Sequence, residues 1–209
     1  MNYLDKLALM EFDIVICPGD ITDVILPKGF SREEIAKILI EELKTLGKPL
    51  LVVPGNMDGE ILDLLEKENI SIHGKGKIID GVGFYGFGGA KTPFNTPLEF
   101  SEEEIKVGLE KAFEDVKNCE IKVQVTHMPP ANTNLDRIIS GAHVGSEVIR
   151  EFIIKNKPDL AISAHIHEAK GIDKLNSTTL INSGRFSEGS CGLVSINRKK
   201  IEAKIIELI

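Results

Sequence analysis

Short apolar runs alternate with amphipathic stretches in the first third of the chain. Runs at residues 13–17 and 50–53 each end at a Pro-Gly pair, which is typical of buried strands. Residues 31–46 have apolar positions at helical spacing, begin with the capping pair Ser31 and Glu34, and end at Gly47. Short helices are also predicted at residues 2–10 and 59–68. This order predicts a parallel sheet with helical crossovers.

The pattern changes in the middle of the chain and then returns. Residues 72–89 are rich in glycine and β-forming residues and predict short antiparallel strands. Ser101 and Glu104 begin a capped helix that continues to about residue 116. A strand at 121–125, a helix at 146–156 and a strand at 160–163 follow, and the tail predicts strands at 178–181, 193–196 and 201–205. We expect a single α/β domain over residues 1–209, with two sheets packed face to face and helices outside both.

A glycine pattern at residues 81–86 matches the dinucleotide-binding fingerprint Gly-x-Gly-x-x-Gly. That fingerprint must follow a strand and open a helix. Here Phe84, Tyr85 and Phe87 continue a β pattern, so we interpret these glycines as parts of strands and turns. A nucleotide-binding oxidoreductase has no other support in the sequence.

Composition narrows the possible functions. The 209 residues carry a net charge of −7, which argues against a nucleic-acid partner, and no apolar run reaches the length of a membrane span. The three cysteines lack zinc-site spacing and do not suggest a disulfide framework. The first residues lack the features of a signal peptide. We therefore expect a cytoplasmic protein that does not bind a membrane.

Four predicted strands are followed directly by polar residues suited to binding metal ions. Because the carboxyl ends of parallel strands meet at one edge of a sheet, we expect these residues to lie together. Nitrogen and oxygen ligands of this kind suit Mn²⁺ first, or Fe, Zn²⁺ or Ni²⁺. His165 and His167, two apart on an extended segment, are expected to face the same space. The candidate metal ligands are Asp20, Asn56, His127, His165 and His167.

Each candidate alone has a simpler structural explanation. A histidine at a strand end is more often a satisfied structural residue than a ligand. An aspartate after glycine is usually part of a turn, and an asparagine before a helix is usually a cap. The occurrence of all of them at four strand ends favours a metal site.

The four motifs, taken in order, resemble those of the calcineurin-like metallophosphoesterases. They are Gly19-Asp20-x-x-Asp23, Gly55-Asn56-x-Asp58, His127 and Ala164-His165-x-His167, and the resemblance runs from about residue 12 to 183. It implies a four-layer α/β/β/α sandwich that hydrolyses small phosphate esters, with water activated by two metal ions. Asp20 would bridge the ions, Asn56, His127 and His165 would complete one shell, and His167 would bind the second ion.

The sequence departs from the family in its metal ligands. The family opens with a strand ending in Asp-x-His, and this sequence contains no Asp-x-His. The sequence begins at what would be the following helix, so we expect the first strand of the sandwich to be missing as well. Either the natural protein begins upstream of Met1, or it works with one complete ion and a weakened second site. In the second case we expect the position of the first strand to be empty, with lower stability or pairing with another chain as a homo-oligomer.

The sequence also departs from the family in its general acid. Met57 occupies the position of a histidine thought to protonate the leaving group, and methionine cannot donate a proton. His143 is therefore a candidate catalytic residue beside Asp20, Asn56 and His127, with His73 or a water as alternatives. Phosphodiesterase branches of the family also lack this histidine, which favours a diester substrate. Ala164 replaces a usual glycine, and Arg185 is a candidate phosphate contact.

A second hypothesis is a binding module with weak or no catalysis. A retromer subunit retains the fold of this family as an interaction surface, and the missing Asp-x-His and Met57 are compatible with that role. A phosphodiesterase assay separates the two hypotheses.

Overall fold

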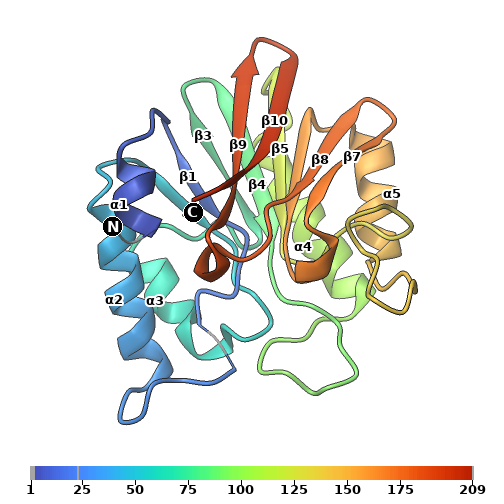
Figure 1. The fold of residues 1–209 in the computed structure, drawn as a ribbon. Coiled ribbons are helices and arrows are strands. Elements are labelled where there is room, and N and C mark those ends of the chain that lie inside the picture. Colours follow the sequence, from blue (N-terminus) through green and yellow to red (C-terminus); the bar gives the residue numbers. More distant parts are fainter. Residues whose placement is uncertain (1–2, 23, 209) are drawn as a thin grey trace.

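A six-stranded mixed sheet forms the centre of the protein. The computed structural model describes residues 3–22 and 24–208. The sheet has the order β3-β4-β5-β6-β8-β7, with the four middle strands parallel and the two edge strands antiparallel (Figure 1). Its strands are β3 (Lys75–Ile79), β4 (Val82–Phe87), β5 (Ile121–Thr126), β6 (Leu160–Ser163), β7 (Gly171–Leu175) and β8 (Thr178–Asn182).

Two smaller pairs of strands lie outside this sheet. β1 (Val15–Cys17) runs parallel to β2 (Leu50–Val52), and β9 (Ser190–Asn197) forms an antiparallel hairpin with β10 (Lys200–Glu207). The helices are α1 (Tyr3–Ala8), α2 (Arg32–Lys44), α3 (Leu62–Lys67), α4 (Glu102–Glu114) and α5 (Glu147–Asn156). A 3₁₀ turn, Gly59–Ile61, precedes α3.

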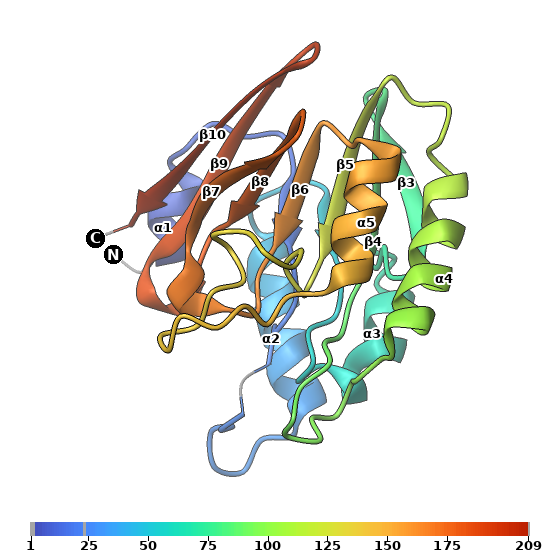
Figure 2. The same cartoon turned by 90° about the vertical axis from the view of Figure 1, so that its right-hand side faces the viewer.

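Three hydrophobic clusters separate successive layers. One cluster joins α2 and α3 to β1 and β2 and includes Ile40 and Leu65. A second, with Phe84 and Val125, lies between the small strand pairs and the large sheet. The third lies under α4 and α5, which cover the outer face of the large sheet (Figure 2). This is a mixed α/β fold with helices on both outer sides, as the sequence predicts.

Most local predictions from the sequence are confirmed. Ser31 with Glu34, and Ser101 with Glu104, form the predicted capping boxes at the starts of α2 and α4. The glycine pattern at residues 81–86 lies in β4, as expected for a strand. The edge strand β7 was not predicted, because its apolar residues are too few to show a clear alternation. Among the described residues, no helix has the length and apolarity needed to cross a membrane.

An apolar cleft of about 1990 Å³ separates β1 from β9. In the described part of the chain, β1 pairs only with β2 and β9 only with β10, and residues of both β1 and β9 line the cleft. Ile162 and Ile181 of the large sheet lie among its walls. The candidate metal ligands also line this cleft, namely Asp20, Asn56, His127, His165 and His167.

Candidate metal centre

Asp20 lies in a sharp turn directly after β1. Gly19 and Asp20 have positive φ angles of 107° and 54°. A side chain at Gly19 would place its Cβ 2.5 Å from the Nδ1 atom of His127 and 2.6 Å from the backbone nitrogen of Gly55. The turn therefore needs glycine, because three chain segments approach one another here.

Asp58 joins the turn after β1 to the turn after β2. Its buried carboxylate accepts hydrogen bonds from the backbone N–H groups of Ile21 (3.1 Å), Thr22 (3.0 Å) and Gly55 (2.8 Å), and from the Thr22 hydroxyl (2.8 Å). The Met57 N–H donates to Asp20 Oδ1 at 3.2 Å. These bonds fix Asp20 and Asn56 relative to each other. Asp58 belongs to the motif Gly55-Asn56-x-Asp58, but the motif alone does not indicate this positioning role.

His127 is fully buried at the end of β5, and its two ring nitrogens have different environments. Nδ1 lies 2.8 Å from the carbonyl oxygen of Pro18, which can only accept, so Nδ1 carries the proton. Nε2 lies 3.0 Å from Asn56 Oδ1 and 3.4 Å from Asp20 Oδ2. Nε2 thus faces two acceptor oxygens, an arrangement that is satisfied by a proton on Nε2 or by a metal ion in its place.

His165 completes a compact group of possible ligands. One ligand atom each from Asp20, His127 and His165 lies within 4.8 Å of the others, and the two imidazole centroids are 5.0 Å apart. Asp20 Oδ2 and Asn56 Oδ1 converge on His127 Nε2, and a divalent cation in place of the Nε2 proton would contact all three atoms. Their mixture of nitrogen and oxygen suits the transition-metal ions expected from the sequence. The residues present therefore fit a metal ion.

Burial and neighbouring groups shift the pKa values of the three residues. Burial alone would raise the pKa of Asp20, but the hydrogen bond and charge of His127 lower it. Burial would lower the pKa of His127, and the contact with Asp20 raises it instead. Burial and the nearby His127 lower the pKa of His165 to about 4. Asp20 is therefore a carboxylate and His165 a neutral imidazole at neutral pH, the forms that bind metal ions. The raised pKa of His127 favours its protonated ring, from which a bound metal ion would displace the Nε2 proton.

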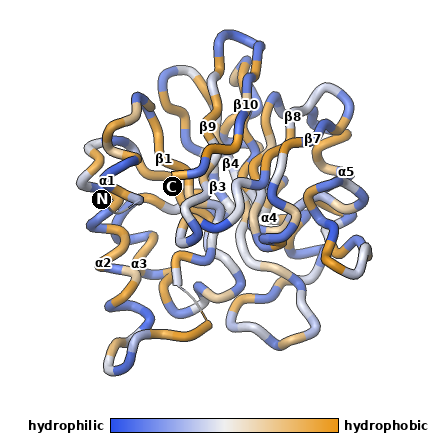
Figure 3. Tube along the Cα trace, in the orientation of Figure 1, coloured by the Kyte–Doolittle hydropathy of each residue, from blue (hydrophilic) through white to orange (hydrophobic). Residues whose placement is uncertain are grey.

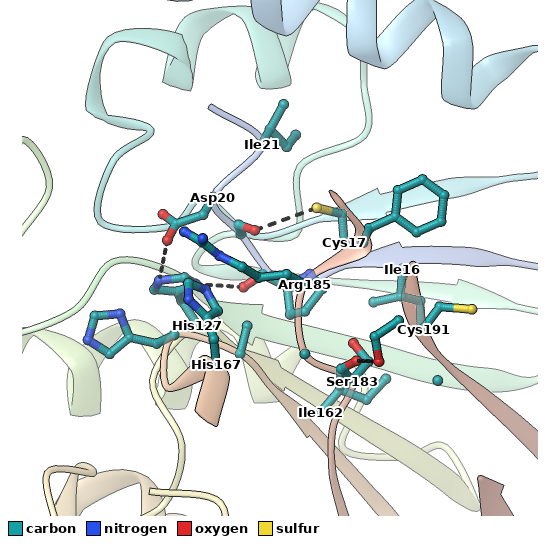
Figure 4. Close-up of a pocket in the computed structure, with 18 of the residues that line it drawn as sticks. Ile16, Cys17, Asp20, Ile21, His127, Ile162, His167, Ser183, Arg185 and Cys191 are labelled. Carbon is teal, nitrogen blue, oxygen red and sulfur yellow. Dashed lines mark hydrogen bonds and ion pairs between the residues drawn. The ribbon is translucent and has the colours of Figure 1, made fainter. Parts of the chain in front are cut away.

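His167 and Arg185 lie beside this group in the same cleft (Figure 4). Burial and the charge of Arg185 lower the pKa of His167. Arg185 extends across the cleft, with its Nη1 atom 4.0 Å from Glu188 Oε1. The expectation that His165 and His167 share an extended segment is wrong, because His165 has a φ of 64° and His167 begins a 3₁₀ turn. The preceding Ala164 has no positive φ and fits its position.

The two histidines considered as general acids lie away from these ligands. His143 Nδ1 is 2.7 Å from the buried carboxylate of Asp136, and neither residue lines the cleft. His73 accepts a hydrogen bond from the Gly88 N–H and packs against Phe87, and burial lowers its pKa to about 4. The catalytic role of His143 stays a prediction, and His73 has a structural environment.

Comparison with known proteins identifies the family of the chain. The family profile described as calcineurin-like phosphoesterase matches residues 1–169. The uncharacterized protein MJ1162 of Methanocaldococcus jannaschii is 38% identical over 187 residues, covering 84% of this chain and 80% of that protein.

Two solved structures show the same fold. TT1561 of Thermus thermophilus has a TM-score of 0.71 at 19% identity, covering 99% of this chain and 93% of that one. A putative 5'-nucleotidase from Staphylococcus aureus, solved in complex with alpha-ketoglutarate, has a TM-score of 0.57 at 14% identity. That match covers 83% of this chain and 40% of the nucleotidase.

Proposed function

Because the chain belongs to the calcineurin-like phosphoesterase family, we propose that it is a metal-dependent hydrolase of small phosphodiesters, with Asp20, Asn56, His127 and His165 as its principal metal ligands. The observation that carries this proposal is the convergence of Asp20 Oδ2 and Asn56 Oδ1 on His127 Nε2. A divalent ion such as Mn²⁺, when bound, lowers the pKa of water and neutralises charge on a phosphoryl group.

The protein's own groups orient the substrate and the ligands. The Pro18 carbonyl fixes the tautomer of His127, and Asp58 holds the Asp20 and Asn56 turns together. Arg185 lies where its guanidinium can bind a phosphate oxygen, and His167 offers a further nitrogen ligand.

The proposed reaction is hydrolysis of one ester bond at phosphorus. A water oxygen forms the new bond to phosphorus, the P–O bond to the alcohol breaks, and the alcohol takes up the proton that water loses. Met57, which lines the cleft beside Asp20, cannot supply that proton. Phosphate esters whose alcohol leaves readily as an anion depend least on a general acid. The proposal of a diester substrate rests on the resemblance to the phosphodiesterase branches of the family that also lack a histidine at the position of Met57.

We expect Mn²⁺ to bind the protein and to activate hydrolysis of bis(4-nitrophenyl) phosphate more than that of 4-nitrophenyl phosphate. Asp20→Asn removes an anionic ligand and should weaken Mn²⁺ binding, measured by calorimetry, by at least tenfold. It should also lower kcat/KM by at least a hundredfold. Asp63→Asn, at an exposed position on α3, is the control for loss of one negative charge.

The result also decides between the two readings of the metal site. Two tightly bound ions per chain would contradict the one-ion hypothesis. Mn²⁺ binding without turnover of either ester would contradict the proposed hydrolase and favour the binding module.

A further inference from the structure

The mouth of the cleft is surrounded by unusually exposed apolar side chains. Five large apolar side chains among the described residues are at least 67% exposed. One of them, Leu9, lies outside the cleft. The other four line the cleft that contains Asp20 and His127. We call these four the apolar rim: Val24 (67% exposed), Ile25 (85%), Phe94 (80%) and Ile139 (92%).

The apolar rim comes from three loops that are distant in sequence and follow parallel strands. Val24 and Ile25 follow β1, Phe94 follows β4, and Ile139 follows β5. Figure 3 shows a hydrophobic segment in the loop before α2, where Val24, Ile25 and Leu26 follow one another. Isolated exposed apolar residues are common on proteins, but their concentration at the mouth of one cleft indicates a binding surface.

Hydrogen bonds hold two of these loops in shape. Glu99 accepts from the Thr92 hydroxyl (2.5 Å) and from the Thr96 N–H (2.8 Å), and the Phe94 N–H donates to Thr92 Oγ1 (3.1 Å). The turn that carries Ile139 is closed by bonds from the Ile138 N–H to the Ala142 carbonyl and from the Gly141 N–H to the Ile138 carbonyl. Phe94 and Ile139 are thus presented at fixed positions, which lowers the entropy lost on binding.

We propose that the substrate is an amphiphilic phosphodiester, whose phosphate reaches Asp20, His127 and Arg185 while its alkyl chain covers the apolar rim. This inference rests on the proposed function and adds the substrate class. A phosphate at the metal ligands leaves the remainder of its ester at the mouth of the same cleft, against the exposed side chains. Covering those side chains with an alkyl chain removes apolar surface from water and stabilises the complex.

The test is a series of 4-nitrophenyl alkyl phosphodiesters with methyl, butyl and octyl chains, used below their micelle-forming concentrations. The leaving group is constant, so the ratio of kcat/KM between octyl and methyl esters reports the chain alone. We expect this ratio to exceed ten, since each methylene that is fully covered contributes up to about fourfold. The double variant Phe94→Ser/Ile139→Ser should reduce the ratio at least fivefold.

Val107→Ser is the matched control, because Val107 is 56% exposed on α4 and does not line the cleft. It should keep the wild-type ratio. A ratio near one in the wild type, or the same ratio in the rim variant and the control, would overturn the substrate class while leaving the hydrolase intact. A rim variant that changed only self-association, measured by light scattering, would also overturn it.

A measurement of ligand binding tests the apolar rim without depending on hydrolysis. If no ester is hydrolysed, the proposed function fails, and calorimetry of the Mn²⁺-loaded protein with octyl phosphate and methyl phosphate still reports on the rim. At least tenfold tighter binding of octyl phosphate, lost in Phe94→Ser/Ile139→Ser, supports the apolar rim. Equal affinity for the two phosphates overturns it.

Discussion

Asp20 and His165 both adopt backbone conformations that are unfavourable for residues with side chains. Their φ angles are 54° and 64°, in the left-handed region. Such conformations cost on the order of 1–3 kcal/mol each and persist where surrounding contacts enforce them. Here the Met57 N–H holds Asp20, and the imidazole of His165 packs against that of His127. In these conformations the two side chains lie in one compact group with His127.

The buried Asp136 supports the loop that carries Ile139. It accepts hydrogen bonds from His143 Nδ1 (2.7 Å) and from the backbone N–H groups of Thr133 (2.9 Å), Asn132 (3.0 Å) and Gly145 (3.1 Å). Burial alone would raise the pKa of Asp136, but these bonds lower it below its usual value. A carboxyl whose pKa is lowered by folding stabilises the fold above its unfolded pKa, near 4.

We therefore expect Asp136→Asn to lower the free energy of unfolding at pH 7 by about 1–3 kcal/mol. The stabilisation from the carboxylate is lost as the pH falls through the lowered folded pKa, so the difference from wild type should shrink below about pH 4. Urea unfolding at several pH values measures this. If the difference in the free energy of unfolding between wild type and Asp136→Asn stayed constant from pH 7 to pH 3, the lowered pKa of Asp136 would be contradicted.

His143→Ala should lower the free energy of unfolding by less than Asp136→Asn does. A wild-type rate of ester hydrolysis in His143→Ala would exclude the catalytic role predicted for His143.

At the scale of elements, the site depends on close contact between loops that follow different strands. The turns after β1 and β2 touch directly, and a Cβ on Gly55 would lie 2.0 Å from Asp20 Oδ1. No rearrangement of flexible side chains removes that overlap, because it also involves the Asp20 backbone nitrogen at 2.2 Å. The glycines of the two turns are therefore part of the metal centre.

We expect Gly55→Ala to weaken Mn²⁺ binding by more than tenfold, because the added methyl group displaces Asp20. Gly171→Ala is the matched control: Gly171 lies in β7, has no positive φ, and a Cβ there meets only Leu135 at an ordinary 3.7 Å. Calorimetry compares the two variants, and circular dichroism checks that both are folded. If Gly55→Ala bound Mn²⁺ with wild-type affinity, close contact between the turns after β1 and β2 would not be needed for metal binding.

The sequence predicts the elements of this site better than its internal geometry. Apolar strand runs and capping boxes such as Ser101–Glu104 are local signals, and they located most strands and helices correctly. The positive φ of His165 and the four hydrogen bonds to Asp58 depend on contacts between distant segments. The apolar rim was missed because Ile139 and Phe94 lie in loops, where hydrophobic periodicity carries no information.

At the scale of the whole molecule, the cleft between β1 and β9 leaves two strand edges without partners among the described residues. Unpaired N–H and C=O groups at a strand edge are a template for pairing with another chain. The walls of this cleft are largely apolar, so pairing there also removes apolar surface from water. The two effects act in the same direction and favour association of this 209-residue chain.

We therefore expect the chain to self-associate as its concentration rises, measured by size-exclusion chromatography with light scattering. Ser195→Lys places a charge at an exposed position of β9 that lines the cleft, and charged side chains on strand edges oppose pairing. That variant should remain monomeric at concentrations where wild type associates. Ser177→Lys adds the same charge at an exposed turn between β7 and β8, outside the cleft, and should behave as wild type. Equal association of both variants would place the contact elsewhere, and a monomeric wild type would show that the open edges do not pair.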